Sequence, residues 1–132
     1  MFTGLDHVAI VVPNTDEALK TFRDKLGLTL LYSEVVNNGT TRLTHLDAGN
    51  TQVQLVEPLS AESPLRAQLA ERGIHLHHIC FRAENVDDAM AAAPSHGLPL
   101  AQAKPHQGTQ GKRAFFIDAS ATEGVRVEVT GK

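Results

Sequence analysis

The chain repeats itself once, and this internal repeat restricts the possible folds more than any other feature of the sequence. Residues 5–10 read LDHVAI and residues 76–81 read LHHICF, so His7 and His78 occupy matching positions. The same spacing relates further pairs, namely Asn14 with Asn85, Asp16 with Asp87, Ala18 with Ala89, and Leu19 with Met90. Self-similarity at a fixed spacing indicates that one structural unit occurs twice in the fold.

The first half of the chain is expected to form a β-α-β-β-β unit. Residues 5–12 are rich in β-branched side chains and precede Pro13, which indicates a strand. Asn14 and Glu17 then have the spacing of a capping box, and Gly27 marks the end of the helix. Further strands are predicted at residues 28–34, 42–48 and 51–57, with a turn signal at Asn38-Gly39.

The second half shows the same order of elements. After the strand at 76–81, a helix from Asn85 to about Ala93 is expected to end at Pro94. Three more strands are predicted near residues 98–104, 113–118 and 125–130, and a linking helix over residues 63–72. The fold class is therefore α+β. We expect a single domain over 1–132, with module 1 at about 1–58, the linker helix at about 59–73 and module 2 at about 74–132.

Composition and charge exclude several classes of protein. The formal net charge of −3 gives no general attraction to nucleic acid or to anionic lipid. No apolar run approaches the length that spans a bilayer, and the N-terminus lacks the basic and apolar parts of a signal peptide. Cys80 is the only cysteine, so no internal disulfide can form. We therefore expect a cytoplasmic protein without nucleic-acid or membrane partners.

Strand alternation identifies the side chains that would carry chemistry. In the last predicted strand, Glu128 lies opposite the face formed by the valines, which is the natural face to bury under a helix. Gln54 has the equivalent place in the first half, just as His7 and His78 match on the opening strands. Pairing of the two halves would bring these four residues to one concave surface.

Two imidazoles, a carboxylate and an amide oxygen suit a borderline divalent ion such as Co, Ni, Mn, Zn or Fe. Four protein ligands would leave open positions at which a small-molecule substrate could chelate the ion. Such an ion polarises a carbonyl group and stabilises an enolate. The predicted chemistry is therefore Lewis-acid catalysis of a proton transfer.

Plainer structural explanations apply to each of these residues taken alone. A histidine in a strand is usually a satisfied polar residue, and a glutamate on a strand face is usually solvated. His77 is an alternative to His78 as a ligand, since the two are adjacent, although they point in opposite directions. The remaining residues interpreted as surface or loop residues are His45, His75, His96 and His106, and Cys80 is interpreted as a small core residue. The recurrence of His and Gln/Glu at matched positions in both halves favours the metal site.

The segments around these residues resemble the methylmalonyl-CoA epimerases, a family within the vicinal oxygen chelate (glyoxalase/bleomycin resistance/dioxygenase) superfamily. The similar segments are LDHVAI at 5–10, QVQLVEP at 52–58, SPL at 63–65, LHHI at 76–79, GTQGKR at 108–113 and GVRVE at 124–128. The resemblance implies two tandem β-α-β-β-β modules in an eight-stranded, partly open barrel with the helices outside. It also implies a homodimer and the metal ligands His7, Gln54, His78 and Glu128.

The reaction implied by the resemblance is epimerisation of an acidic carbon next to a thioester, with a CoA thioester as the substrate. Glu128 would take part in the proton transfer as well as binding the metal, and Lys112 and Arg113 are expected to contact the substrate. Family members often have an acidic residue in or just after the turn at 37–42, but no carboxylate lies between Asn37 and Leu46 here. His45 is a substitute candidate for that second acid or base. The family also usually has an HPKS-like stretch where residues 118–121 read DASA.

Three other functions remain open at this point. A glyoxalase I-like lyase is the first, although that enzyme usually has glutamate at the position of Gln54. An Fe(II) dioxygenase is the second, because two histidines and a glutamate can form a facial triad. The third is a non-catalytic binder that sequesters a ligand or confers resistance, since a fold alone does not establish catalysis.

Overall fold

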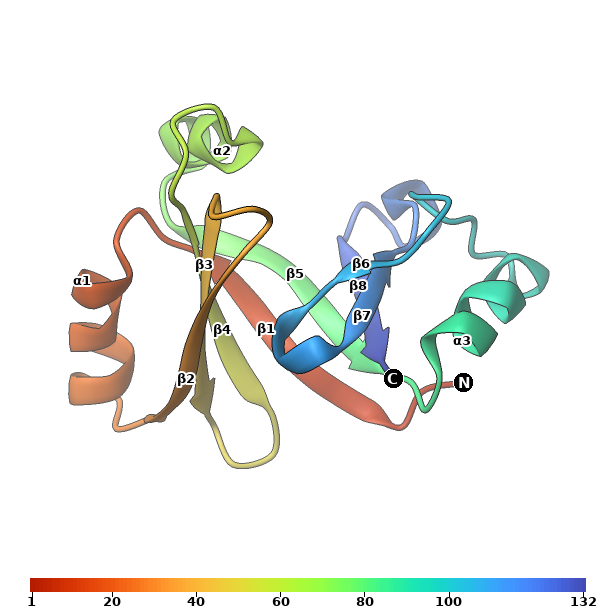
Figure 1. Cartoon of the computed structure of the whole chain (residues 1–132), viewed down its shortest axis with the longest axis horizontal. Helices are drawn as coiled ribbons and strands as arrows, with labels where there is room; N and C mark the ends of the chain where they lie inside the picture. The colour runs from red at the N-terminus through yellow and green to blue at the C-terminus, as the bar shows by residue number, and fades with distance from the viewer. The chain divides into compact units, whose positions relative to one another are not determined.

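The computed structural model describes all residues from 1 to 132, and it has an α+β fold (Figure 1). The strands are β1 (Gly4–Val11), β2 (Thr29–Val36), β3 (Thr41–Asp47), β4 (Gln52–Pro58), β5 (His75–Arg82), β6 (His106–Gln107), β7 (Arg113–Phe116) and β8 (Val127–Gly131). The α-helices are α1 (Thr15–Leu19), α2 (Pro64–Arg72) and α3 (Val86–Ala92). A π-helical stretch, Lys20–Lys25, continues α1, and three short 3-10 turns are Ala93–His96, Thr109–Gly111 and Ala119–Ala121. None of the helices has the length and apolar character needed to cross a bilayer.

The eight strands form one mixed sheet in the order β2-β3-β4-β1-β5-β8-β7-β6. The pairs β2–β3, β3–β4, β7–β8 and β6–β7 are antiparallel, whereas β5 and β8 run parallel. The order is linear, with β2 and β6 at its two edges, so the sheet is open. Two β-α-β-β-β modules in an eight-stranded sheet confirm the predicted fold class.

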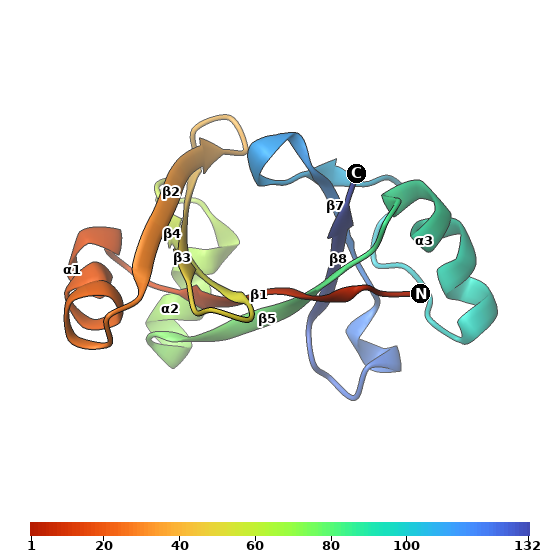
Figure 2. The ribbon, with the colours of Figure 1, turned by 90° about the horizontal axis from the view of Figure 1, so that it is seen from below.

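Contacts between residues are concentrated within two compact units of the chain. One unit is formed by Met1–His7 with His78–Lys132, and the other by Val8–His77. In the unit Val8–His77, α1 packs beside β2, β3 and β4 (Figure 2). Its core joins Leu19 of the helix to Leu46 and Leu55 of the strands. The backbone N–H of Val12 donates to the carbonyl of Val56 over 2.9 Å, which ties the end of β1 to β4.

The unit Met1–His7 with His78–Lys132 has a separate core, in which α3 packs beside β7 and β8 (Figure 1). Val86 and Met90 of α3 contact Phe115 of β7 and Val129 of β8. In the parallel pair β5–β8, Cys80 lies opposite Glu128. Val127 and Val129 share the core with residues of α3, so the apolar residues of β8 face the helix, as the alternation in the sequence predicts.

The predicted helix boundaries agree closely with the structure. The side-chain oxygen of Asn14 accepts from the N–H of Glu17, and that of Asn85 accepts from the N–H of Asp88, each over 2.9 Å. Gly27 follows the first helix at φ +79°, the left-handed conformation that ends many helices. Pro94 does not end the structured segment at once, because it lies inside the 3-10 turn that follows α3.

The strand predicted at residues 98–104 is wrong. This segment contributes only one isolated bridge, Leu100 to Ile117, and the pairing strand is the two-residue β6 further along the chain. Pro99 lacks a backbone donor, which makes a continuous ladder unfavourable. At Gln102 the side-chain oxygen accepts the N–H of Phe116 over 3.0 Å, in the place where a paired strand would offer a backbone carbonyl.

Candidate metal centre

His7 and His78 bring their imidazole rings together from neighbouring positions on β1 and β5. Their Nε2 atoms are 3.3 Å apart, and the rings meet edge to face with centroids 5.4 Å apart. Only 4% of His7 and 8% of His78 is exposed. Two buried imidazoles that point the same ring nitrogen at each other require either a shared proton or a shared cation, because a close pair of lone pairs is unfavourable.

Glu128 of β8 completes a group of three donor atoms. Its Oε1 atom is 3.5 Å from Nε2 of His7 and 3.2 Å from Nε2 of His78, and the residue is 8% exposed. For metal–ligand bonds of about 2.1 Å, adjacent ligand atoms are about 3.0 Å apart in an octahedron and about 3.4 Å apart in a tetrahedron. The donor set of His7, His78 and Glu128 therefore fits a single divalent ion.

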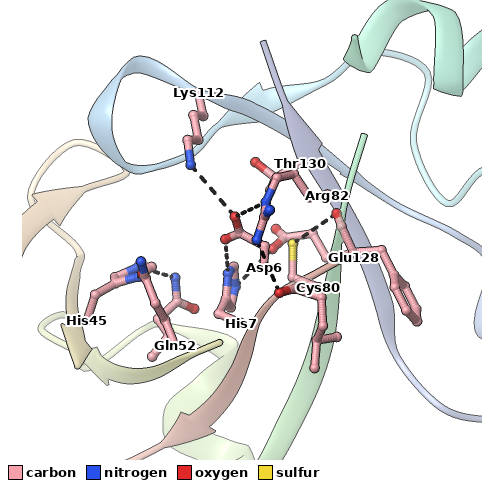
Figure 3. A network of polar contacts seen from close by, with 12 residues as sticks. Asp6, His7, His45, Gln52, Cys80, Arg82, Lys112, Glu128 and Thr130 are labelled. Carbon is pink, nitrogen blue, oxygen red and sulfur yellow. Dashed lines mark hydrogen bonds and ion pairs between the residues drawn. The ribbon is translucent and has the colours of Figure 1, made fainter. Parts of the chain in front are cut away.

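Asp6 orients the ring of His7 by contacting its other ring nitrogen, Nδ1 (Figure 3). Its Oδ2 atom is 2.8 Å from Nδ1 of His7, and its Oδ1 atom lies 3.5 Å from Nε of Arg82 and 3.7 Å from Nζ of Lys112. Burial acts to raise the pKa of Asp6, but the hydrogen bond from His7 and the nearby cations lower it to about 2. The ionised carboxylate accepts the Nδ1 proton, so loss of the proton on Nε2 leaves a lone pair there that can bind a metal.

The charges at the centre follow from the same contacts. Burial alone raises the pKa of Glu128, yet hydrogen bonds from His106, His7 and His78 hold it well below its ordinary value. Burial alone lowers the pKa of His7, but its bonds to Asp6 and Glu128 raise it overall. An ionised carboxylate among imidazoles is the electrostatic arrangement that a bound cation stabilises.

His106 also reaches this centre, and its interpretation as a surface or loop residue is wrong. Its Nε2 atom lies 2.8 Å from Oε2 of Glu128, and its ring stacks on Phe116 with centroids 5.5 Å apart. The sequence contains no signal for this residue. His106 has no histidine counterpart in the first half, and it lies in the two-residue strand β6 before β7.

Gln54 lies in the unit Val8–His77, where 5% of it is exposed. Its Nε2 atom is 3.0 Å from Nε2 of His45, whose Nδ1 atom is 2.7 Å from Oε1 of Gln52. His45 stacks on Tyr32 and is 1% exposed, so its interpretation as a surface or loop residue is also wrong. It is the strand partner of Gln54 in the β3–β4 pair, which explains its burial.

The two basic residues expected to contact a substrate have different surroundings. Lys112 lies beside Asp6, as described above, whereas Arg113 makes a two-pronged ion pair with Asp87 of α3, with both distances 2.9 Å. Cys80 is fully buried, as predicted for a small core residue. Its burial and the nearby carboxylate of Glu128 raise the pKa of the thiol, which keeps it protonated.

Comparison with known proteins gives consistent results. Residues 6–116 match the Glyoxalase/Bleomycin resistance protein/Dioxygenase superfamily. An uncharacterized protein of Bacillus subtilis, YqjC, is 34% identical over 125 residues, covering 95% of this chain and 89% of that protein. Mitochondrial methylmalonyl-CoA epimerase of Mus musculus is 30% identical over 129 residues, covering 95% of this chain and 71% of that protein.

Solved structures show the same relationship. Methylmalonyl-CoA epimerase from Mycobacterium tuberculosis superposes with a TM-score of 0.90 at 30% identity, covering 98% of this chain and 88% of that one. A methylmalonyl-CoA epimerase in complex with methylmalonyl-CoA and NH4+ superposes with a TM-score of 0.89 at 27% identity, covering 100% of this chain and 96% of that one.

Proposed function

Because this chain belongs to the Glyoxalase/Bleomycin resistance protein/Dioxygenase superfamily, and its relatives of named function are epimerases, we propose that it is a metal-dependent isomerase. The proposed reaction inverts the acidic carbon next to the carbonyl of a malonyl-type CoA thioester. The observation that carries the proposal is the convergence of three buried donor atoms from His7, His78 and Glu128.

We propose that His7, His78 and Glu128 hold one divalent ion, with Gln54 as a fourth ligand. A bound divalent ion would polarise the substrate carbonyl and stabilise the enolate. Nitrogen and oxygen donors suit Co, Ni, Mn, Zn or Fe, so the donor set alone does not select among them. Asp6 keeps His7 in the tautomer that can bind the ion, and the low pKa of Glu128 keeps its carboxylate ionised.

Glu128 is also the proposed acceptor of the substrate proton. It is an ionised carboxylate whose two oxygens have different partners. No carboxylate lies between Asn37 and Leu46. His45 is therefore the proposed acid that returns a proton to the substrate carbon. His45 is buried with Tyr32 stacked on its ring, which holds it in one orientation.

The proposal also concerns the CoA group that carries the substrate acyl group and the oligomeric state of the protein. A relative solved with methylmalonyl-CoA supports a CoA thioester as the substrate, with Lys112 and Arg113 as candidate cations for its anionic groups. The homodimer, the cytoplasmic location and the organisation as a single domain stay predictions. Sedimentation of the purified protein at several concentrations tests the dimer.

The proton transfer is tested with methylmalonyl-CoA in heavy water. The metal-loaded protein is expected to introduce deuterium at the acidic carbon, as read by mass spectrometry. Glu128→Gln keeps an oxygen donor but removes the basic carboxylate, so it is expected to lose deuterium exchange more than metal binding. Equal loss of both would reduce Glu128 to a ligand only.

The other functions give different results in the same preparation. Consumption of O₂ would identify a dioxygenase, and turnover of a thiol hemiacetal would identify a glyoxalase I-like lyase. Tight ligand binding without metal and without exchange would identify a binder. Any of these three results, in the absence of deuterium exchange, would overturn the proposal.

A further inference from the structure

The two carboxylate oxygens of Glu128 contact different groups. Oε1 lies 3.5 Å from Nε2 of His7 and 3.2 Å from Nε2 of His78, whereas Oε2 lies 2.8 Å from Nε2 of His106. We infer that His106 is a positioning residue that holds Oε2 and so makes Glu128 bind the metal through Oε1 alone. This inference rests on the metal site proposed above.

The hydrogen bonds of Gln102 determine which nitrogen of His106 carries the proton. Oε1 of Gln102 accepts the N–H of Phe116 over 3.0 Å, and its Nε2 donates to the carbonyl of Lys104 over 2.6 Å. These two bonds fix the orientation of the amide. The second hydrogen on Nε2 then faces Nδ1 of His106, 3.1 Å away.

A neutral His106 is therefore a donor to Glu128. Gln102 Oε1 also lies 3.3 Å from Nδ1 of His106, but a proton on Nδ1 would leave the Nε2 lone pair of the neutral ring 2.8 Å from the carboxylate oxygen of Glu128, which is unfavourable. With Nδ1 as the acceptor of the amide hydrogen, the single ring proton is on Nε2 and points at Oε2 of Glu128. The neutral ring donates the hydrogen bond to Glu128, so His106 does not need to be positively charged for this contact.

Strand pairing and ring contacts hold His106 in this place. In β6 it pairs with Ala114 of β7, and Phe116 of β7 pairs with Glu128 of β8. The ring of Phe116 stacks on His106 at 23° and meets the edge of His78 at 89°, with centroids 5.4 Å apart in the second case. The register of three adjacent strands thus sets the distance between His106 and Glu128.

The consequence concerns the number of coordination positions. A carboxylate that binds through both oxygens occupies two positions on a metal, whereas one held by His106 occupies one. The coordination position that the second carboxylate oxygen does not occupy is then available to a chelating substrate. Hydrogen-bond partners of metal ligands commonly contribute about 10-fold to 100-fold to metal affinity.

The test compares three variants of the full chain by titration with Co(II), followed by visible absorption. His106→Phe retains an aromatic ring against Phe116 but has no donor, and His106→Gln retains an N–H that can reach Glu128. His96→Phe, at an exposed position in the 3-10 turn after α3, is the matched control. Thermal unfolding of the metal-free proteins confirms that each variant is folded.

We expect His106→Phe to bind Co(II) about 10-fold more weakly or worse, with a changed d–d spectrum that reports a different coordination number. His106→Gln and His96→Phe are expected to retain the wild-type affinity and spectrum. Wild-type affinity and an unchanged spectrum in His106→Phe would overturn the inference while the metal site stands. A wild-type protein that binds no Co(II) would instead remove the proposed site, and this inference with it.

Discussion

Among the single residues of the metal centre, Asp6 has the most instructive surroundings. One of its oxygens accepts from His7, and the other is near the cations of Arg82 and Lys112. The hydrogen bond from His7 and the two cations keep Asp6 ionised, and the ionised carboxylate in turn keeps the Nε2 atom of His7 available to a metal. A residue next to a proposed ligand in the sequence thus controls the tautomer of that ligand.

Asp6→Asn is expected to weaken Co(II) binding about 10-fold to 100-fold and to change its pH dependence. Protons compete with the metal for His7, so affinity falls as the pH falls through the pKa of that imidazole. In the wild type this pKa is raised, because the bonds to Asp6 and Glu128 outweigh burial. Removing the charge of Asp6 lowers the pKa, so the fall in affinity moves to lower pH.

Titration with Co(II) between about pH 5 and about pH 8 measures both effects, because an imidazole changes charge in this range. Asp16→Asn, at an exposed residue in the first turn of α1, is the matched control and is expected to follow the wild type. An Asp6→Asn profile that coincides with that of the control would mean that Asp6 does not act through His7.

Among the elements, β8 combines the proposed ligand Glu128 with a tightly packed end. Gly131, its last residue, lies so close to the carbonyl of Ala83 that an added Cβ atom would overlap the backbone oxygen. The N–H of Ala83 donates to the carbonyl of Thr130 over 2.8 Å, which fixes the two backbones at this separation. The end of β8 therefore admits no side chain.

Gly131→Ala is expected to reduce the free energy of unfolding by about 1–3 kcal/mol, the usual cost of overpacking. Gly108→Ala is the control, because its Cβ would be 3.5 Å from the carbonyl oxygen of Lys112 and in ordinary contact. The control is expected to change stability by less than about 0.5 kcal/mol. Urea denaturation measures both variants, and a Gly131→Ala protein as stable as the control would contradict the close approach.

For the molecule as a whole, the three donor atoms come from β1, β5 and β8, which are far apart along the chain. A metal that binds only the folded state would therefore stabilise the fold. At a free metal concentration of about 100 times the dissociation constant, the free energy of unfolding is expected to rise by about 2.7 kcal/mol. A chelator is expected to reverse this stabilisation.

The histidine pair at 77 and 78 provides the control for this prediction. His78→Ala removes a ligand and is expected to abolish both the stabilisation and stoichiometric metal binding, measured by elemental analysis. His77→Ala, on the neighbouring position of β5, is expected to retain both. If His78→Ala still bound one metal per chain, the ligand would have been assigned to the wrong residue. The same would hold if only His77→Ala lost the metal.

The sequence by itself determined the modular plan and most of the residues of the candidate metal centre. The repeat and the strand alternation are recorded along the chain, because equivalent positions recur at one spacing and side chains alternate with a period of two. This is why the convergence of His7, His78 and Glu128 was predictable, together with the caps at Asn14 and Asn85.

The tertiary structure alone decided the surroundings of those ligands. His106 contacts Glu128 because β6 pairs with β7 and β7 with β8, a register that no local pattern in the sequence at 98–107 records. The same segment misled the strand prediction, because Gln102 replaces a backbone acceptor with its side chain. Contacts between segments distant in sequence depend on packing, which periodicity along one strand does not encode.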